Sequence, residues 1–366
     1  MKILYYFRDI DSMMFQWQKY HIVEELSHHS IQVDIISPTW YESIEQANED
    51  IIRVLQSGKY ALFMTCLNDQ YIYEETMGVI RKMGTPTLLF CPDNLVAPFS
   101  HKSIAPLFDL VWLTSRETEY LFKKWGCRTA FLPYAANPFF LIPTNSDEEI
   151  HRVGFIGTPH GSRIDRINYL LKNNVPITIH TNNNNLSNKF VRAPLRDYYK
   201  LFYNYSKYPI GRKLAVAAVI DKLAKRELHD VYDCLERKEA VPLVNLSEVN
   251  GKYDLILSFT DANSSGVLKN PVKIVNLRNF EIPMSGGIQF TLYSDELASY
   301  FENDKEIVMG KSMEECVEKA HFYLSDRNTQ LRNRIKNAAR ARAEKQHTWF
   351  HRFQVVFQYL GLDYSI

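Results

Sequence analysis

The sequence predicts an α/β protein made of two doubly wound units. Its 366 residues exceed the usual size of one domain and suggest about two. Short apolar runs alternate with segments of helical spacing through the first 138 residues, and the alternation resumes at residue 151. A stretch without periodicity lies between the two parts. Strands that alternate with helices in this way form a parallel sheet with helices on both faces.

The first unit contains six expected strands. Each is a short run that is apolar on both faces and bounded by polar or turn residues, as parallel strands between two layers of helices are. The runs are residues 3–7, 31–37, 60–66, 87–91, 109–114 and 129–133. Helical spacing occurs over residues 15–29, and Gly126 suits the left-handed end of a later helix.

A linker separates this unit from the second. Pro138, Pro143 and the short polar residues 144–147 show no periodicity. In the second unit we expect strands at residues 151–156, 176–180, 241–246, 253–259 and 288–293. Residues 189–240 are predicted to be helical, and the carboxyl end carries further helices. One of these begins at Ser312, which has capping-box spacing to Glu315.

Composition excludes several classes of protein. The net charge of +1 lacks the basic excess of a dedicated nucleic-acid binder, so no nucleic-acid partner is expected. The five cysteines are scattered and form no CxxC pair, which argues against a disulfide scaffold or a structural zinc site. The first residues read as a strand rather than a signal peptide, and no apolar run is long enough to span a bilayer. We therefore expect a cytoplasmic protein, at most peripheral to the inner face of the membrane.

A glycine turn opens the second unit. Gly157, Thr158 and Gly161 follow a strand and precede a helix that carries Arg163. Such a turn lets a phosphate approach backbone N–H groups at the positive end of a helix, and an arginine there can donate two parallel hydrogen bonds. The spacing matches neither GxGxxG nor GxxxxGK[ST], which argues against a nicotinamide site and an NTPase. A plain tight turn at Gly157 is the alternative.

A second motif combines an acidic residue with two glycines. Glu281 lies where a loop becomes a short helix, and Gly286 and Gly287 follow it. A carboxylate in such a place can accept hydrogen bonds from both ribose hydroxyls, while the glycines allow close backbone approach or a positive φ. The alternative is that Glu281 is a surface residue at a helix start.

Residues 276–287, Asn-Leu-Arg-Asn-Phe-Glu-Ile-Pro-Met-Ser-Gly-Gly, resemble the core motif of group-one GT-B glycosyltransferases of the spore-maturation, CgeB-like type. The resemblance continues through Glu296-Leu297, Phe301 and residues 305–308 to His347-Thr348-Trp349 and Arg352. Upstream, residues 153–157 together with Arg163 look like the family's first donor-domain strand and turn. The resemblance is specific over residues 150–180 and 270–353, and is one of fold alone before residue 130.

This resemblance implies a GT-B fold: two Rossmann-like domains that face each other across a cleft, with a carboxyl-terminal helix that crosses back to the first domain. The domains would be residues 1–138 on the acceptor side, residues 139–347 for a nucleotide-sugar donor, and the returning helix 348–366. Glu281 would bind the ribose and Arg163 the diphosphate, with Gly157, Thr158, Arg278, Gly286 and Gly287 beside the donor. The related enzymes need no metal or other cofactor, and no DxD motif follows a strand here.

The acceptor-side domain offers three catalytic candidates. Asp93 follows the expected strand 87–91, and parallel α/β sheets place their sites at the carboxyl ends of strands. It is the leading candidate for a general base or for a group that stabilises an oxocarbenium-like transition state. A turn-forming aspartate in the Pro-Asp-Asn sequence is the alternative. His101 and Asp11 are weaker candidates.

Residues 189–226 are strongly basic and rich in tyrosine. Only Asp197 and Asp221 oppose the positive charge there. The basic residues are Lys189, Arg192, Arg196, Lys200, Lys207, Arg212, Lys213, Lys222, Lys225 and Arg226. A solvated helix face explains this charge, and so does an anionic partner such as a lipid surface or a charged glycan.

The expected activity is transfer of a sugar from a nucleoside-diphosphate sugar to a hydroxyl of a glycan, a lipid-linked glycan or a protein. Two alternatives stay open: a GT-B sugar-nucleotide epimerase, and a coat or binding protein that keeps the fold without turnover. The sequence does not distinguish between sugars, nucleotide bases, acceptors or stereochemical outcomes.

Overall fold

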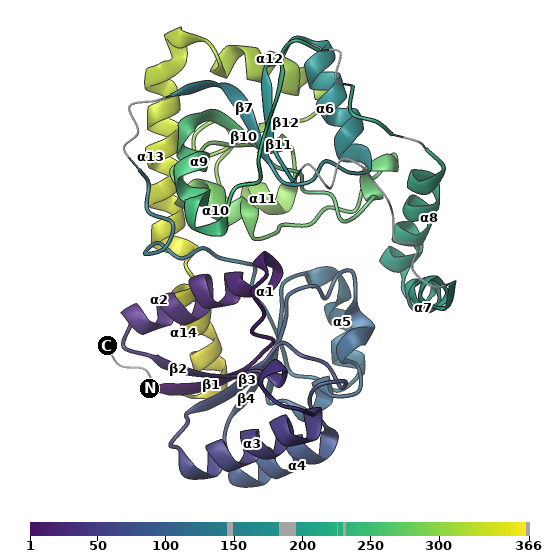
Figure 1. Ribbon diagram of the computed structural model, residues 1–366, viewed down its shortest axis with the longest axis vertical. Helices are drawn as coiled ribbons and strands as arrows, with labels where there is room; N and C mark the ends of the chain where they lie inside the picture. Colours follow the sequence, from purple (N-terminus) through teal and green to yellow (C-terminus); the bar gives the residue numbers. More distant parts are fainter. Residues whose placement is uncertain (145–148, 183–194, 225, 230–231, 364–366) are drawn as a thin grey trace. The chain divides into compact units, whose positions relative to one another are not determined.

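The computed structural model describes residues 1–144, 149–182, 195–224, 226–229 and 232–363 (Figure 1). The chain divides into two compact units, which are described separately. Unit 1 comprises Met1–Phe140 and His347–Ile366, and unit 2 comprises Leu141–Gln346.

Unit 1 is built on a six-stranded parallel sheet of order β2-β1-β3-β4-β5-β6. The strands are β1 (Lys2–Tyr6), β2 (Gln32–Ile36), β3 (Leu62–Thr65), β4 (Thr87–Cys91), β5 (Leu110–Leu113) and β6 (Thr129–Phe131). All six were predicted from the sequence. The helices are α1 (Met13–Gln18), α2 (Glu24–His28), α3 (Ile44–Ser57), α4 (Glu74–Met83), α5 (Glu119–Lys124) and α14 (Trp349–Leu360). Short helical turns are η1 (Lys19–Val23, a π-helix), η2 (Pro38–Trp40), η3 (Pro98–His101), η4 (Ala105–Leu107) and η5 (Arg116–Thr118).

Helices cover both faces of this sheet. Figure 1 shows α3 and α4 on one face, and α2 and α14 on the other. Every residue of β3, β4 and β5 is buried, which explains why these strands read as continuous apolar runs. The carboxyl-terminal helix α14 packs into the core of unit 1: the Trp349 ring lies 6.0 Å from that of Phe90, and the Phe353 ring 5.5 Å from that of Trp112. The expected return of this helix to the first unit is confirmed.

Unit 2 has a second six-stranded parallel sheet, of order β12-β11-β10-β7-β8-β9. The strands are β7 (Ile150–Ile156), β8 (Ile177–His180), β9 (Leu235–Lys238), β10 (Tyr253–Leu257), β11 (Gln289–Leu292) and β12 (Val308–Gly310). The helices are α6 (Ser162–Lys172), α7 (Leu195–Ser206), α8 (Pro209–Leu223), α9 (Leu246–Lys252), α10 (Arg278–Met284), α11 (Asp295–Tyr300), α12 (Met313–Tyr323) and α13 (Thr329–Gln346). Its short turns are η7 (Leu243–Asn245), η8 (Ser265–Val267) and η9 (Asp326–Asn328).

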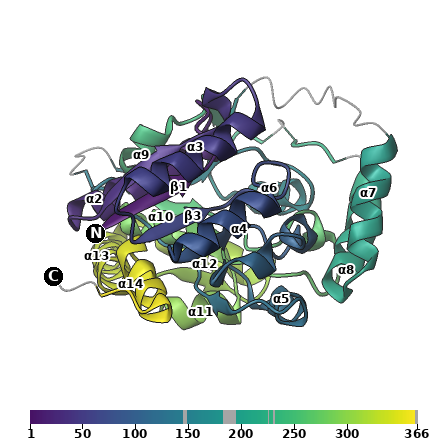
Figure 2. The same ribbon diagram turned by 90° about the horizontal axis from the view of Figure 1, so that it is seen from below.

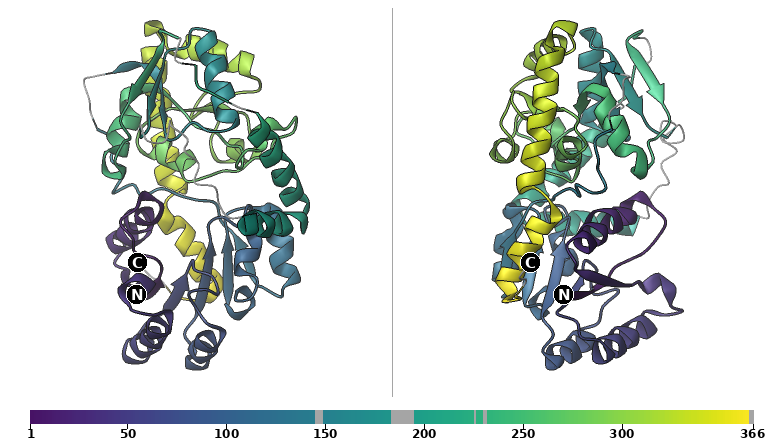
Figure 3. Two further views of the ribbon diagram at one scale, coloured as in Figure 1. Left: turned by 45° about the vertical axis from the view of Figure 1, so that its right-hand side comes forward. Right: turned by 90° about the vertical axis from the view of Figure 1, so that its left-hand side faces the viewer.

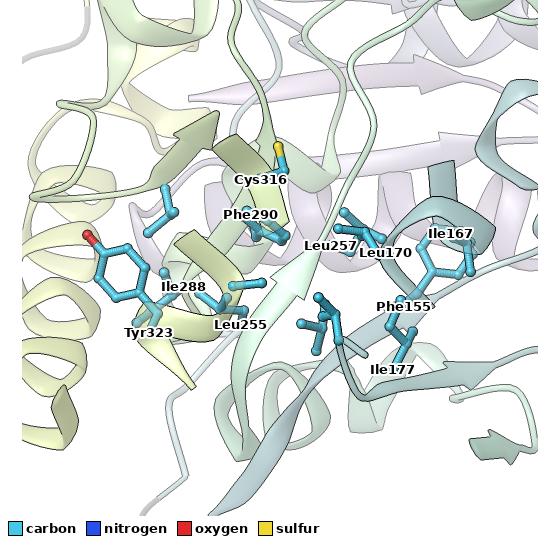
Figure 4. Close-up of a cluster of buried hydrophobic side chains, with 14 of the residues drawn as sticks. Phe155, Ile167, Leu170, Ile177, Leu255, Leu257, Ile288, Phe290, Cys316 and Tyr323 are labelled. Atoms are coloured by element: carbon cyan, nitrogen blue, oxygen red, sulfur yellow. The ribbon is translucent and has the colours of Figure 1, made fainter. Parts of the chain in front are cut away.

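Alternating side chains give unit 2 a core on each face of its sheet. Leu255 and Leu257 point into the larger cluster, which Figure 4 shows around Phe155, Ile288 and Phe290. Helices α6 and α12 complete this cluster. Ile256 points to the opposite face and packs with Tyr253 and Ile282 of α10. Successive side chains of a strand point to opposite faces of the sheet, so β10 contributes to both cores because both faces are covered.

One predicted strand is wrong, and two strands of the structure, β9 and β12, were not predicted. Residues 241–246 contain the turn η7 and the first residue of α9, and the edge strand β9 occupies residues 235–238, inside the segment predicted to be helical. Pro242 has no N–H to donate to a sheet, which disfavours a strand there. The sequence of β9, Leu-Glu-Arg-Lys, is polar because an edge strand is only partly covered.

Two local signals are confirmed. The Ser312 side chain accepts a hydrogen bond from the backbone N–H of Glu315 at 3.2 Å, which caps α12. Gly126 adopts a φ of 85° after α5. In the part of the chain that the structure describes, no helix is both long and apolar enough to cross a bilayer.

Candidate functional site

The strand order of unit 2 locates a ligand site. From β7 the chain moves outward through β8 and β9, then returns to the other side of β7 with β10, β11 and β12. The direction of winding therefore reverses between β7 and β10. Open α/β sheets bind ligands outside the carboxyl ends of the strands at such a switch point. The glycine turn follows β7, and a loop that begins at Ser258 follows β10.

The glycine turn leaves room above its backbone. Gly157 has a φ of 139°, which favours glycine, and a Cβ added there would meet no atom within 4 Å. Thr158 is partly exposed in the turn, and Gly161 has a φ of 58°. Helix α6 begins directly afterwards and carries Arg163, and the backbone N–H groups of Arg163 and Ile164 donate to the carbonyls of His160 and Gly161 at 3.2 and 3.1 Å. The expected binding of a phosphate at this turn stays a prediction.

The loop after β10 adds Asp261 and Lys273, and α6 adds Arg166; sequence reasoning missed these three charged side chains. Asp261 is buried and forms ion pairs with Arg166 of α6 and with Lys273, whose Nζ lies 2.9 Å from Oδ1. The spacing of Arg166 three residues after Arg163 on one helix was a usable signal. Asp261 and Lys273 gave none, because only the fold brings the loop beside α6.

Helix α10 carries Arg278 and Glu281 one turn apart. Glu281 is only 4% exposed, so its interpretation as a surface residue is wrong. Burial lowers the pKa of the Arg278 guanidinium, and the negative charge of Glu281 acts in the opposite direction. Asn279 fixes the start of the helix, because its Oδ1 accepts a hydrogen bond from the backbone N–H of Asn276 at 2.7 Å.

These elements bring cations together at the switch point. Burial, and then the positive charge of Arg278, lower the pKa of the Arg163 guanidinium, while Asp261 opposes them. The Nε atom of Arg163 is buried, and no group in the described ranges hydrogen-bonds to it. Asp261 and Glu281 lie among the four cations Arg163, Arg166, Lys273 and Arg278. A third carboxylate, that of Asp221 on α8, borders the glycine turn at Gly161. Buried charge is costly unless it is compensated, so this cluster favours an anionic ligand.

Gly286 and Gly287 have local roles. Gly286 has a φ of 75° and ends α10, while Gly287 donates its N–H to the Ile282 carbonyl at 3.0 Å. A Cβ on Gly287 would lie 2.7 Å from the backbone oxygen of Asn250 on α9. These contacts explain both glycines without a ligand, and their expected place beside the donor stays a prediction.

The described residues contain one grouping with the spacing of metal ligands, and it lies elsewhere. Glu149, His151 and Asp254 meet at the amino ends of β7 and β10, opposite to the glycine turn. Arg332 Nε lies 3.0 Å from Asp254 Oδ1, and Lys336 Nζ 3.8 Å from Glu149 Oε1. Because two cations already neutralise these carboxylates, we interpret the group as structural.

Asp93 follows β4 in unit 1, as predicted. Its backbone carbonyl accepts hydrogen bonds from Val96 and Ala97, so it is also a turn residue. Its side chain reaches the surface, yet the surrounding protein desolvates the carboxyl and raises its pKa. The next residue, Asn94, holds the turn: Oδ1 accepts from the N–H groups of Thr114 and Ser115 at 2.9 and 3.0 Å.

The other two candidates differ in setting. His101 Nε2 lies 3.2 Å from the Cys66 carbonyl at the end of β3, and burial lowers the pKa of the imidazole. The charge of Asp93 acts on the Cys66 thiol, so Asp93 and His101 border the same strand end. Asp11 is exposed in the loop after β1. Sequence reasoning missed Arg8 in that loop, which packs against the Phe15 ring at 5.0 Å.

The basic segment forms the helices α7 and α8. Lys189, Arg192 and Lys225 lie outside the described residues, and the side chains of Arg196 and Lys200 are not described. Lys207, Arg212, Lys213 and Lys222 are exposed, whereas Arg226 is partly buried in ion pairs with Asp165 and Asp221.

Comparison with known proteins supports the GT-B fold that the sequence motifs imply. Residues 218–358 match the model of a glycosyl transferase-like family, and this range includes Arg278 and Glu281. No curated protein matches the chain. Among solved structures, Anabaena HepE in complex with UDP-glucose is 14% identical with a TM-score of 0.56, covering 99% of each chain. A glycosyltransferase from Rickettsia africae is 10% identical with a TM-score of 0.58, again covering 99% of each. Sucrose-phosphate synthase from Thermosynechococcus elongatus is 11% identical with a TM-score of 0.54, covering 99% of this chain and 100% of that one.

The fold is GT-B. Each of these structures matches the whole length of the chain, so the likeness includes both sheets and the returning helix α14. At such low identity the likeness establishes the fold, and the chemistry has to be argued from the residues of this chain.

Proposed function

We propose that the protein is a glycosyltransferase that binds a nucleoside-diphosphate sugar at the switch point of unit 2. The observation that carries the proposal is the cation cluster of Arg163, Arg166, Lys273 and Arg278 beside an open glycine turn. A diphosphate supplies the negative charge that this cluster lacks. The match to the family model supports this assignment over residues 218–358, which include Lys273 and Arg278.

Each donor-side residue has a role in this proposal. The N–H groups at the start of α6 and the Arg163 guanidinium bind the diphosphate. Glu281, one helical turn beyond Arg278, accepts hydrogen bonds from the ribose hydroxyls. Cationic side chains and a helix end neutralise the leaving diphosphate, so the proposed reaction uses no metal and no other cofactor. The CgeB-like subtype rests on the motif at residues 276–287.

Unit 1 supplies the acceptor side. We assign to Asp93, whose carboxyl has a raised pKa, the role of accepting the proton of the attacking hydroxyl or of stabilising positive charge on the sugar. The acceptor is a hydroxyl of a glycan, a lipid-linked glycan or a protein. An anionic partner for residues 189–226 belongs to the same proposal, since four basic side chains of this segment are exposed.

A thermal-shift screen tests the donor. We expect UDP, GDP, dTDP or CDP, or a sugar conjugate of one of them, to raise the melting temperature of the chain. At 100 times its dissociation constant a ligand adds about 2.7 kcal/mol to the free energy of unfolding. UDP-sugars are the first choice, because UDP-glucose is named as the ligand of the HepE structure. No stabilisation by any of these ligands contradicts the proposal.

A turnover assay with the stabilising donor separates the alternatives. Release of the nucleoside diphosphate that depends on an acceptor supports transfer. Conversion of the donor into an isomer without release indicates an epimerase. Binding without either reaction indicates a non-catalytic protein.

A further inference from the structure

Helices α7 and α8 form a hairpin at the side of unit 2, which we call the α7–α8 hairpin. Figure 2 and the left view of Figure 3 show the two helices in contact at the edge of that unit, with α7 running across one end of α8. Lys207 and Tyr208 connect them. The helices approach closely at Gly211, where a Cβ would lie 2.4 Å from the Tyr205 carbonyl oxygen. Leu214 and Ala217 are buried on the inner side of α8.

Polar contacts attach the inner side to the loops of the candidate site. Asp221 accepts hydrogen bonds from Ser264 Oγ at 2.7 Å and from Arg226 Nη1 at 2.5 Å. Asn263 Nδ2 donates to Tyr205 Oη at 3.3 Å. Asn263 and Ser264 belong to the loop that follows β10, and Asp221 also borders Gly161 of the glycine turn. The hairpin is therefore fixed to the elements that hold the cation cluster.

The outer side of the hairpin is apolar. On α8 the exposed residues recur at i, i+3, i+4 and i+7: Val216, Val219, Ile220 and Leu223, the last 79% exposed. On α7 they are Tyr199, Phe202 and Tyr203, with Tyr199 72% exposed. A surface helix of a globular protein normally turns such a stripe toward the core. Here the stripe faces outward, and a contiguous exposed apolar patch marks a docking surface.

Positive charge accompanies the stripe. Lys207, Arg212, Lys213 and Lys222 are exposed on the same two helices and their connection. The one acidic side chain described there, Asp221, is engaged by Arg226 and Ser264. A second copy of the chain would bring eight cations together across such a contact, and their repulsion opposes self-association. A water-soluble glycan offers no apolar volume to cover valine, isoleucine and leucine.

We propose that the α7–α8 hairpin binds the surface of an anionic lipid bilayer. The aliphatic stripe enters the boundary between headgroups and acyl chains, and the tyrosines lie at the headgroup level. Lysine and arginine contact lipid phosphates. Helix α8 has 15 residues, so it is about 22 Å long and lies in the interface without spanning the bilayer. Resting on the proposed function, this contact holds the donor site at the membrane and favours the lipid-linked glycan among the acceptors.

Flotation of the full chain with lipid vesicles tests this inference. The vesicles consist of phosphatidylcholine, with or without phosphatidylglycerol, at low and high salt. We expect flotation with phosphatidylglycerol vesicles that weakens as salt rises. Replacing Val216, Ile220 and Leu223 together by serine should lower the partition coefficient more than about tenfold at either salt concentration. Lys213→Gln and Lys222→Gln should each lower it about fivefold at low salt only.

Phe322→Ser is the matched control, because Phe322 is half exposed on α12 and its loss should leave flotation unchanged. No flotation with anionic vesicles at low salt overturns the proposal, and so does unchanged flotation of the serine variant. A concentration-dependent dimer that the serine substitutions dissociate, without lipid binding, assigns the surface to a second copy instead. The thermal shift caused by UDP is measured on the same samples, so a failure of lipid binding and a failure of donor binding are separate results.

Discussion

Arg163 occupies an unusual place for an arginine. Its Nε atom is buried without a partner among the described residues, and Arg278 lies close enough to lower the pKa of its guanidinium. Two cations remain near each other in a partly desolvated place at a cost in free energy. Binding of a diphosphate removes that cost, which is why the proposed function begins at this residue.

We expect Arg163→Gln to weaken binding of UDP about ten- to hundredfold and binding of uridine little, since charge-assisted hydrogen bonds contribute about 1.5–3 kcal/mol. Isothermal titration with both ligands measures the difference. Arg334→Gln on α13, which removes an exposed arginine, is the control and should leave both affinities unchanged. Equal losses for UDP and uridine would place Arg163 away from the phosphates.

Glu281 is predicted to recognise ribose. We expect Glu281→Gln to weaken UDP binding and, more specifically, to reduce the preference for UDP over its 2′-deoxy analogue. The carboxylate accepts a hydrogen bond from the hydroxyl that the analogue lacks, and the variant keeps the volume of this buried side chain. The ratio of the two dissociation constants is the measurement. A ratio equal to that of the unmodified chain contradicts the role.

Asp93→Asn should lower the turnover number much more than donor affinity. Asp93 lies in unit 1, whereas the residues proposed to bind the nucleotide lie in unit 2. Desolvation raises the pKa of its carboxyl, so the acidic limb of the pH–rate profile should follow this group and disappear in the variant. If Asp93→Asn transfers sugar at an unchanged rate, the catalytic role is contradicted and Asp93 serves only in the turn after β4.

The sequence predicted the residues that border the site better than the contacts between them. Glycine turns and a charged residue at a helix start are local patterns, so Gly157, Arg163 and Glu281 were visible without a structure. Asp261 pairs with Lys273 within one loop, and it reaches Arg166 of α6 only because β10 lies beside β7 in the sheet. No pattern in one sequence carries that adjacency.

At the scale of elements, Glu25 fixes the carboxyl-terminal helix. This buried residue of α2 accepts hydrogen bonds from the backbone N–H groups of Trp349 at 3.1 Å and Phe350 at 2.7 Å, in the first turn of α14. Burial raises the pKa of its carboxyl to about 7, and these two hydrogen bonds oppose the shift. The carboxyl therefore carries a proton in the folded chain at pH values where it would be ionised in the unfolded chain.

The raised pKa of Glu25 makes its contribution to the stability of the fold decrease as pH rises. Between pH 4.5, the ordinary pKa of a glutamate, and about pH 7 the folded state binds more protons at Glu25 than the unfolded state does. Its contribution to stability is full below pH 4.5 and is lost as pH rises through 7. The quantity to compare is the melting temperature of Glu25→Gln minus that of the unmodified chain. We expect this difference to be more positive at about pH 8 than at about pH 5.

Comparison with the unmodified chain is needed because His29 and His351 titrate in the same region. Burial lowers the pKa of both imidazoles, so they add stability as pH rises, opposite to Glu25. The two histidines cancel in the difference between variant and unmodified chain. Glu24→Gln, at the neighbouring position of α2, is the control. A difference that does not change with pH would refute the role of Glu25.

Most of the strands buried on both faces were predictable, whereas the buried three-residue strand β12 was not predicted. The six strands of unit 1 stand out because buried parallel strands are uniformly apolar. Edge strand β9 was missed because its outer side meets solvent, and its Leu-Glu-Arg-Lys sequence has no apolar signature. The apolar residues 241–246 were taken for a strand, although Val244 is 61% exposed in the folded chain.

At the scale of the whole molecule, each unit has its own hydrophobic core. The core of unit 1 includes residues from both ends of the chain, such as Phe90 and the Trp349 and Phe353 side chains of α14. The core of unit 2 forms around β7, β10 and β11 and includes Phe290. Units with separate cores can unfold in separate transitions, in which case no single melting temperature describes the chain.

We therefore expect calorimetry to resolve two transitions, of which UDP shifts only the one that belongs to unit 2. Phe353→Ala should destabilise unit 1 by about 3–5 kcal/mol and lower the transition that UDP does not move, because it leaves a cavity beside Trp112. Phe290→Ala is the mirror variant and should lower the UDP-sensitive transition by a similar amount, since Phe290 is equally buried. One cooperative transition that both variants lower as a whole would show that the two units unfold together.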